Sequence, residues 1–341
     1  MKTIMFAAIA AAATAGGAAA QDVTLRLHHF LSAEAPVQTG LLEPWAAAVE
    51  EQSGGRIDVE IYPAMQLGGK PPQLFDQARD GIVDVAWTLL GYTPGRFPIA
   101  EVFELPFMAG TAAETTNALQ RFQAKYLADE LSSVHPLVLH APAAYKIHTR
   151  DKAVASLGDL GGLKIRAPSR PMTDGLNALG ATAVGMPVPE VPQALTTGVI
   201  DGAVVPWEVF GSLRIETMAK DHTEFGEENG GMATSVMALV MNRAVYEGLP
   251  DDLKAVVDAN SGAALAEIAG RVLDEAEATE RQKALDAGGT VHLVPEADVA
   301  AWVEATRPVV DAWVAAMEGA GHDGATMLED ARAMLNAAGG S

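Results

Sequence analysis

The sequence predicts an α/β protein built of two lobes with a ligand cleft between them. Three observations support this prediction: β-rich alternating runs are followed by helical runs, this alternation recurs in two successive series, and no low-complexity linker separates the series. Several chain segments should therefore cross between the lobes, which then move as a hinge. In such folds ligands bind at the carboxyl ends of the strands, in the crevice.

The first series alternates strands and helices before residue 90. Glycines follow both helices, at Gly54-Gly55 and at Gly81, where they are suited to end a helix. Strands joined by helices in this way favour a largely parallel sheet. The expected elements are a strand at Val23–Phe30, a helix at Glu43–Gln52, a strand at Arg56–Tyr62, a helix at Pro71–Asp80 and a strand at Val83–Leu89.

The second series starts near Leu137–Leu139 and ends in a helical C-terminal part. Pro250 opens a long helical region that reaches about Ala287 and contains Gly262 and Gly270. Apolar residues near helical spacing between 302 and 317 are typical of a core face. The other expected elements are a strand leading into Arg166, helices at Asp174–Leu179 and Val191–Thr197, and strands at Val199–Val205 and Met237–Met241.

Composition excludes several classes of function. The 341 residues carry 44 Asp plus Glu against 23 Lys plus Arg, a formal charge of -21. This excess argues against nucleic acid or an anionic membrane surface as the main partner, since both repel an acidic protein. Cysteine is absent, which excludes disulfides, thiolate nucleophiles and Cys-based zinc or iron–sulfur sites.

The N-terminus predicts export. Residues 1–20 combine an early lysine, an apolar stretch and the small residues Ala18-Ala19-Ala20, the pattern of a signal peptide with its cleavage site. No cysteine follows the expected cleavage, so no lipid anchor is expected there. No later stretch approaches about 18 uncharged apolar residues. We therefore expect a periplasmic protein that is not anchored in the membrane.

Motifs for catalysis and cofactors are missing. The sequence contains no G-x-S-x-G, no H-E-x-x-H, no G-x-x-x-x-G-K-[ST] and no G-x-G-x-x-G. The adjacent His28 and His29 would face opposite sides of a strand, so they are poorly placed to bind one metal ion. We expect no cofactor, no metal and no catalysis.

An ordered set of short segments resembles the TRAP transporter solute-binding proteins, the DctP-like family. The set covers nearly the whole chain after residue 20, and its strongest block is Asp159-Leu160-x-Gly162–Pro168 (DL-x-GLKIRAP). The other segments are Ser53–Ile57, Tyr62-Pro63, Gln66–Gly69, Gly81–Asp84, Glu104–Phe107, Leu179–Ala181, Met186-Pro187, Glu190-Val191, Ala194-Leu195 with Gly198–Gly202, Met241-Asn242 and Leu249–Leu253.

The resemblance implies a periplasmic receptor that closes around a small organic acid and delivers it to the small and large permease subunits of a TRAP transporter. It implies the two-lobed periplasmic binding protein fold, with a long helix crossing both lobes, and a monomer is expected. The expected organisation is a signal peptide at 1–20, lobe I at 21–143 plus 232–271, and lobe II at 144–231 plus 272–341.

The resemblance also indicates the charged contacts of the ligand. The arginine of the K-I-R motif pairs with the ligand carboxylate in the family, and that position is Arg166, whose planar guanidinium matches a carboxylate. A second basic residue of the family corresponds to Lys146. After Asp201-Gly202 the chain departs from the family pattern, and we expect Trp207 as an apolar wall and Glu208 as a partner for a ligand hydroxyl or amine.

Four residues of the first lobe are expected at strand ends near the cleft: His29, Phe30, Trp87 and Tyr92. Large aromatic side chains with one or two charged anchors favour a monocarboxylate over a compact dicarboxylate. The sequence leaves two alternatives open. The ligand could be an amine or a zwitterion, in which case Glu208 would matter more, or the chain could be a periplasmic enzyme acting through His29 or Glu208.

Overall fold

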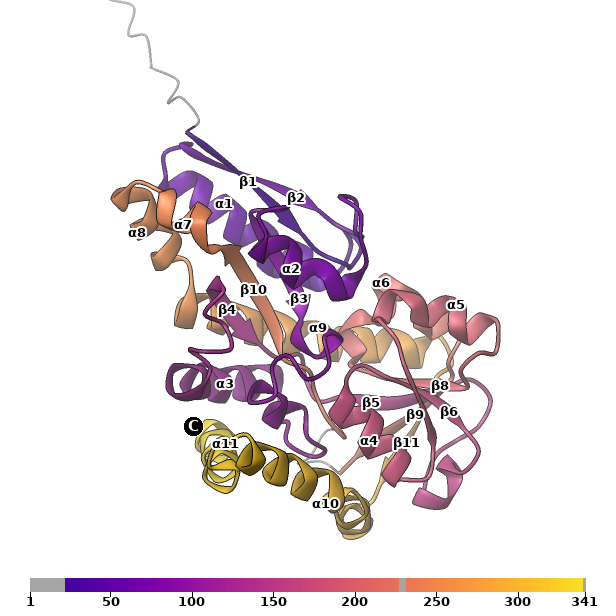
Figure 1. The fold of residues 1–341 in the computed structure, drawn as a ribbon. Helices are drawn as coiled ribbons and strands as arrows, with labels where there is room; N and C mark the ends of the chain where they lie inside the picture. Colours follow the sequence, from indigo (N-terminus) through magenta and orange to yellow (C-terminus); the bar gives the residue numbers. More distant parts are fainter. Residues whose placement is uncertain (1–21, 227–230, 340–341) are drawn as a thin grey trace, which may run out of the picture.

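The computed structural model describes residues 22–226 and 231–339, and two β-sheets form its framework (Figure 1). The predicted signal peptide lies outside the described residues. The first sheet has the order β2-β1-β3-β10-β4, in which only β10 runs antiparallel to its neighbours. Its strands are β1 (Val23–His28), β2 (Ile57–Tyr62), β3 (Val85–Leu89), β4 (Val134–His140) and β10 (Met237–Asn242).

The second sheet has the order β11-β9-β5-β8-β6-β7, and β5 is antiparallel to both of its neighbours. Four of its short strands, β5, β7, β9 and β11, were not expected from the sequence. The strands are β5 (Lys146–Thr149), β6 (Lys164–Ala167), β7 (Thr182–Gly185), β8 (Gly202–Val205), β9 (Asp221–Phe225) and β11 (Thr290–Val294).

Helices cover the two sheets and join them. The first sheet carries α1 (Glu43–Gln52), α2 (Leu74–Arg79), α3 (Ala112–Tyr126), α7 (Arg243–Gly248) and α8 (Asp251–Ala259). The second carries α4 (Arg170–Ala178), α5 (Val191–Thr196) and α6 (Phe210–Leu213). The C-terminal helices are α9 (Gly262–Asp286), α10 (Glu296–Gly319) and α11 (Gly324–Gly339). No helix in the described ranges has the length and apolarity of a membrane span.

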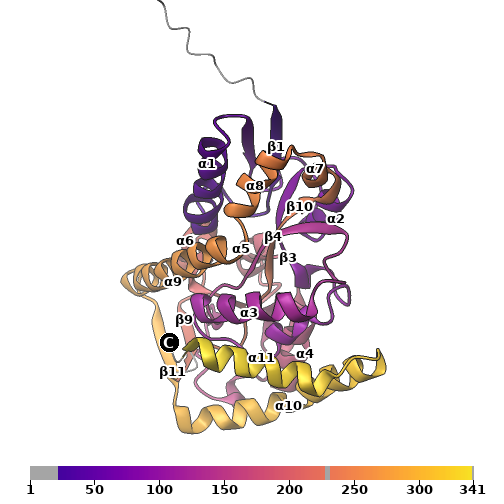
Figure 2. The ribbon, with the colours of Figure 1, turned by 90° about the vertical axis from the view of Figure 1, so that its left-hand side faces the viewer.

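The predicted two-lobed α/β fold is confirmed, and α9 is the helix that crosses both lobes. The helix packs against α3 and β4 on the side of the first sheet and against α6 and the turn Trp207–Val209 on the side of the second. The chain also crosses between the sheets after β4 and after β9 (Figure 1). The lobe ranges stay a prediction. One contact joins the two ranges: α11, which was assigned to lobe II, packs against α3, which was assigned to lobe I (Figure 2).

The prediction of one long helical region from Pro250 to about Ala287 is wrong, because the structure has two helices there. The region consists of α8 and α9, separated at Asn260-Ser261, and Gly262 begins α9 with a φ of 60°. Gly270 lies inside α9 at its crossing with α3. A Cβ atom at this position would lie 2.6 Å from Cα of Ala113, so glycine permits the close approach of the two helices.

We expect Gly270→Ala to lower the free energy of unfolding by about 1–3 kcal/mol, because the added methyl group forces α9 away from the backbone of α3. Urea unfolding followed by tryptophan fluorescence measures the change. The matched control is Gly319→Ala at the end of α10, where a Cβ meets nothing within 4 Å. Equal stability of the two variants would contradict this prediction, because it would mean that the crossing of α3 and α9 has room for a methyl group.

Candidate functional site

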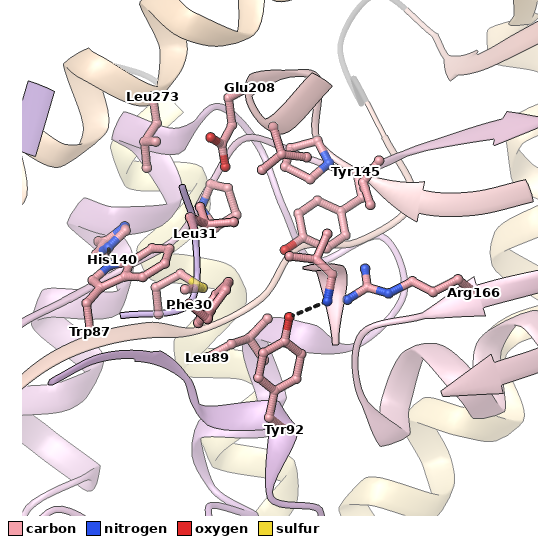
Figure 3. Close-up of a pocket in the computed structure, with 16 residues that line it drawn as sticks. Phe30, Leu31, Trp87, Leu89, Tyr92, His140, Tyr145, Arg166, Glu208 and Leu273 are labelled. Atoms are coloured by element: carbon pink, nitrogen blue, oxygen red, sulfur yellow. Dashed lines mark hydrogen bonds between the residues drawn. The ribbon is translucent and has the colours of Figure 1, made fainter. Parts of the chain in front are cut away.

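A mostly apolar cavity with an empty volume of about 420 Å³ lies where the two lobes meet (Figure 3). Both sheets, the segments that cross between them and α9 contribute to its wall. The lining residues are Phe30, Leu31, Trp87, Leu89, Tyr92, His140, Pro142, Tyr145, Arg166, Val188, Val205, Pro206, Glu208, Val209, Met237 and Leu273.

Arg166 on β6 supplies the positive charge of the cavity. Its side chain is held by two backbone carbonyls: Nε donates to Met186 O and Nη1 donates to Val204 O, both at 3.0 Å. Only 1% of the residue is exposed, and its Nη2 has no hydrogen-bond partner. Burial lowers the pKa of the guanidinium, yet arginine stays protonated in proteins.

No carboxylate among the described residues lies within 4.0 Å of the Arg166 guanidinium. The ion pairs found among these residues are formed by other side chains. A buried, unpaired cation is costly unless an anion accompanies it. The cavity is therefore built to receive a negative charge beside Arg166.

Two tyrosine hydroxyls face the same region as the guanidinium (Figure 3). The oxygen of Tyr92 accepts a hydrogen bond from Val188 N–H at 2.9 Å, which joins the first lobe to the second and leaves the tyrosine proton free to donate. Tyr145 is held in the crossing segments, where its N–H donates to Ala233 O at 2.6 Å. Burial raises the pKa of both phenols, so both remain hydrogen-bond donors.

Aromatic rings form the opposite wall. Phe30 stacks on Trp87 with ring centres 4.9 Å apart and lies 5.5 Å from the ring of Tyr92. Trp87 Nε1–H donates to Nε2 of His140 at 2.8 Å. Burial lowers the pKa of His140 to about 3, so the ring is neutral and carries its proton on Nδ1. This wall offers flat apolar surface without a second cation.

Glu208 enters the cavity from a different side from Arg166 (Figure 3). It is 5% exposed, its Oε2 has no hydrogen-bond partner, and its backbone N–H donates to Glu277 Oε2 at 3.1 Å. Burial, together with the negative charges of Glu277 and Glu280, raises the pKa of Glu208 to about 8. Glu208 is therefore mostly protonated at pH 7.

Five of the eight site residues predicted from the sequence line the cavity: Phe30, Trp87, Tyr92, Arg166 and Glu208. The other three lie outside it. His29 follows β1 next to Phe30 but has its Nε2 2.8 Å from Gln38 Oε1. Trp207 packs against His148 and donates from Nε1 to Glu224 Oε1 at 3.0 Å.

Lys146 is likewise outside the cavity, because it forms a buried ion pair with Glu277 of α9. Its neighbour Tyr145 lines the cavity instead. Successive side chains of an extended segment point to opposite sides, so only one member of this pair faces the cavity. Lys146 and Trp207 line a wider, polar groove, where Lys146 and Arg281 are each paired with a glutamate.

Several lining residues were missed by sequence reasoning, notably Tyr145, His140 and Leu273. The neighbouring Lys146 was a usable signal for Tyr145. No local pattern marks Leu273, which reaches the cavity from the middle of α9. Among the described residues no group of three or more His, Asp or Glu side chains is arranged to hold a metal ion.

Comparison with known proteins gives one family model, described as bacterial extracellular solute-binding protein, family 7, which matches residues 27–316. A TRAP solute binding protein from a marine metagenome, described as specific for aromatic acid ligands, was solved with metahydroxyphenylacetate. It is 44% identical, covers 92% of this chain and 98% of its own, and superposes with a TM-score of 0.90.

Two further solved structures are similar. A TRAP solute binding protein from Rhodoferax ferrireducens T118, solved with copurified benzoate, is 41% identical and covers 93% of this chain and 98% of its own, with a TM-score of 0.90. A TRAP periplasmic solute binding protein from Bordetella bronchiseptica, with bound (R)- and (S)-mandelate, is 31% identical and covers 92% of this chain and 98% of its own, with a TM-score of 0.84.

Proposed function

This chain belongs to the bacterial extracellular solute-binding proteins of family 7, and from that premise we propose that its ligand is an aromatic monocarboxylate. The protein is a TRAP-type receptor for a small organic acid and not an enzyme. The observation that carries the ligand proposal is the buried, unpaired guanidinium of Arg166 in a cavity walled by aromatic rings.

The ligand carboxylate binds at Arg166. Nε and one hydrogen of Nη1 are used by backbone carbonyls, which leaves the second hydrogen of Nη1 and both hydrogens of Nη2. Those two nitrogens can donate side by side to the two oxygens of one carboxylate. The hydroxyl groups of Tyr92 and Tyr145 add donors on the same side.

The rest of the ligand is an apolar ring. Phe30 and Trp87 offer a stacked aromatic surface, and offset stacking stabilises a bound ring beyond the area it buries. Arg166 is the one lysine or arginine among the lining residues in the described ranges, so a second ligand carboxylate would be buried without a counter-charge. The neutral state of Glu208 near pH 7 also disfavours an amine.

The proposal also includes the role of the protein in transport. After removal of residues 1–20 the protein acts in the periplasm as a monomer and hands its ligand to the small and large permease subunits. Ligand binding favours the closed form. The hydrogen bond from Val188 N–H to the Tyr92 oxygen joins the lobes beside the cavity.

A thermal-shift screen of the mature protein, freed of ligand by unfolding and refolding, tests the proposal. Benzoate, phenylacetate and mandelate are expected to raise the melting temperature, because a ligand at about 100 times its dissociation constant adds about 2.7 kcal/mol of stability. Isophthalate, succinate, glucuronate and benzylamine are expected to have little effect. Stabilisation by succinate, glucuronate or benzylamine but by no aromatic monocarboxylate would reject the ligand class.

A further inference from the structure

We propose that Glu208 determines specificity within this class: its carboxyl group hydrogen-bonds a hydroxyl group carried by the ligand away from its carboxylate. The preferred ligands are then hydroxylated aromatic acids. This inference rests on the proposed function and deepens it. The solved relatives leave the matter open, because their ligands include both metahydroxyphenylacetate and unsubstituted benzoate.

The geometry places one unsatisfied polar group in the wall of an apolar cavity. Glu208 lies in the turn Trp207–Val209, and its carboxyl group points into the cavity near Leu273 of α9, apart from Arg166 (Figure 3). The buried Oε2 has no partner. The backbone N–H of Glu208 donates to Glu277, which holds the turn that carries the carboxyl group against α9.

The surroundings of Glu208 keep it neutral. Glu277 and Glu280 of α9 face it with negative charge, and burial acts in the same direction. The nearby cations are engaged elsewhere, since Lys146 pairs with Glu277 and Lys283 pairs with Glu280. A neutral carboxyl group offers both an O–H donor and a carbonyl acceptor, which is the complement of a hydroxyl group.

The energetic consequence is discrimination between otherwise similar acids. A buried polar group left without a partner loses its hydrogen bonds to water. A ligand with a correctly placed hydroxyl restores one, whereas a plain aromatic ring leaves Glu208 unsatisfied. Sites built in this way reject the analogue that lacks the hydroxyl. We expect at least one hydroxybenzoate isomer to bind roughly tenfold more tightly than benzoate.

Isothermal titration calorimetry on the mature protein tests this with benzoate, the three hydroxybenzoates and 3-(hydroxymethyl)benzoate. Glu208→Gln keeps a neutral donor and acceptor, so it should retain the preference for a hydroxylated ligand. Glu208→Leu has no polar group at this position, so it should abolish the preference. Glu216→Gln is the matched control, because Glu216 also has an unpartnered buried oxygen but lies outside the cavity.

The pH profile provides a second readout. The raised pKa of Glu208 means that the protonated form persists up to about pH 8. Above that pH the ionised carboxylate should repel the anionic ligand, so the affinity for 3-(hydroxymethyl)benzoate should decline. Glu208→Gln should show no such decline. The hydroxymethyl compound serves here, because its alcohol does not ionise in this range.

Equal binding of benzoate and all hydroxylated acids, or a preference that survives in Glu208→Leu, would overturn the inference and leave the proposed function intact. A wild type that prefers 3-(aminomethyl)benzoate, with loss of that preference in Glu208→Gln, would show that the ionised form acts and would also overturn it. Failure of every aromatic monocarboxylate to bind would overturn both the inference and the proposed function.

Discussion

Arg166→Met is expected to weaken benzoate binding about 100- to 4,000-fold. Removing one member of a buried charge pair costs about 3–5 kcal/mol, and each 1.4 kcal/mol is about a tenfold change in the dissociation constant. Methionine roughly fills the space of the arginine stem, so loss of the charge and of the N–H donors dominates. Isothermal titration calorimetry with benzoate measures the effect directly.

The ligand-free stability of this variant separates binding from folding. Arg166→Met leaves the carbonyls of Met186 and Val204 without their donor, but it also removes a buried cation that has no anionic partner. The two effects oppose each other, so a folded variant is expected whose melting temperature no longer responds to benzoate. Lys164→Met, an exposed change on the same strand, is the control. A folded Arg166→Met protein with unchanged benzoate affinity would contradict the assignment of the anchor.

Lys146→Met is expected to lower the free energy of unfolding by about 3–5 kcal/mol while leaving benzoate affinity nearly unchanged. The side chains of Lys146 and Glu277 are only 9% and 13% exposed, so the substitution leaves a carboxylate buried without its cation. The double variant Lys146→Met/Glu277→Gln should recover much of the loss, since the uncompensated charge is gone. Urea unfolding measures all three proteins.

The defect in Lys146→Met should depend on pH with a defined sign. Burial raises the pKa of Glu277 and Lys146 opposes this, so without the lysine the folded-state pKa moves further above the unfolded value. Stability is then retained at low pH, where Glu277 is protonated, and lost as the pH rises. The exposed pair Arg271–Glu275 of the same helix provides the control Arg271→Met, with a small expected effect. Unchanged stability with abolished benzoate binding would restore Lys146 as a ligand contact.

The fold class and the family were predictable because they depend on features spread along the chain. Alternating apolar residues predicted β1, β2 and β3 close to their observed bounds, and glycines predicted the ends of α1 and α2. The ordered short segments predicted the family, which the family model confirms. The four strands missed in the second sheet are only four or five residues long, too short for periodicity to distinguish them from loops.

The sequence by itself determined the two-lobed architecture, the receptor function and the position of Arg166 within its motif. Only the tertiary structure decided which neighbours line the cavity: Phe30 rather than His29, and Tyr145 rather than Lys146. Successive side chains of an extended segment point to opposite sides, and the side that becomes the cleft depends on how the lobes pack. The packing of α9 against both lobes likewise decides that Leu273 lines the cavity and that Glu277 pairs with Lys146. Residues more than 100 positions apart meet there, and no local pattern encodes their contact.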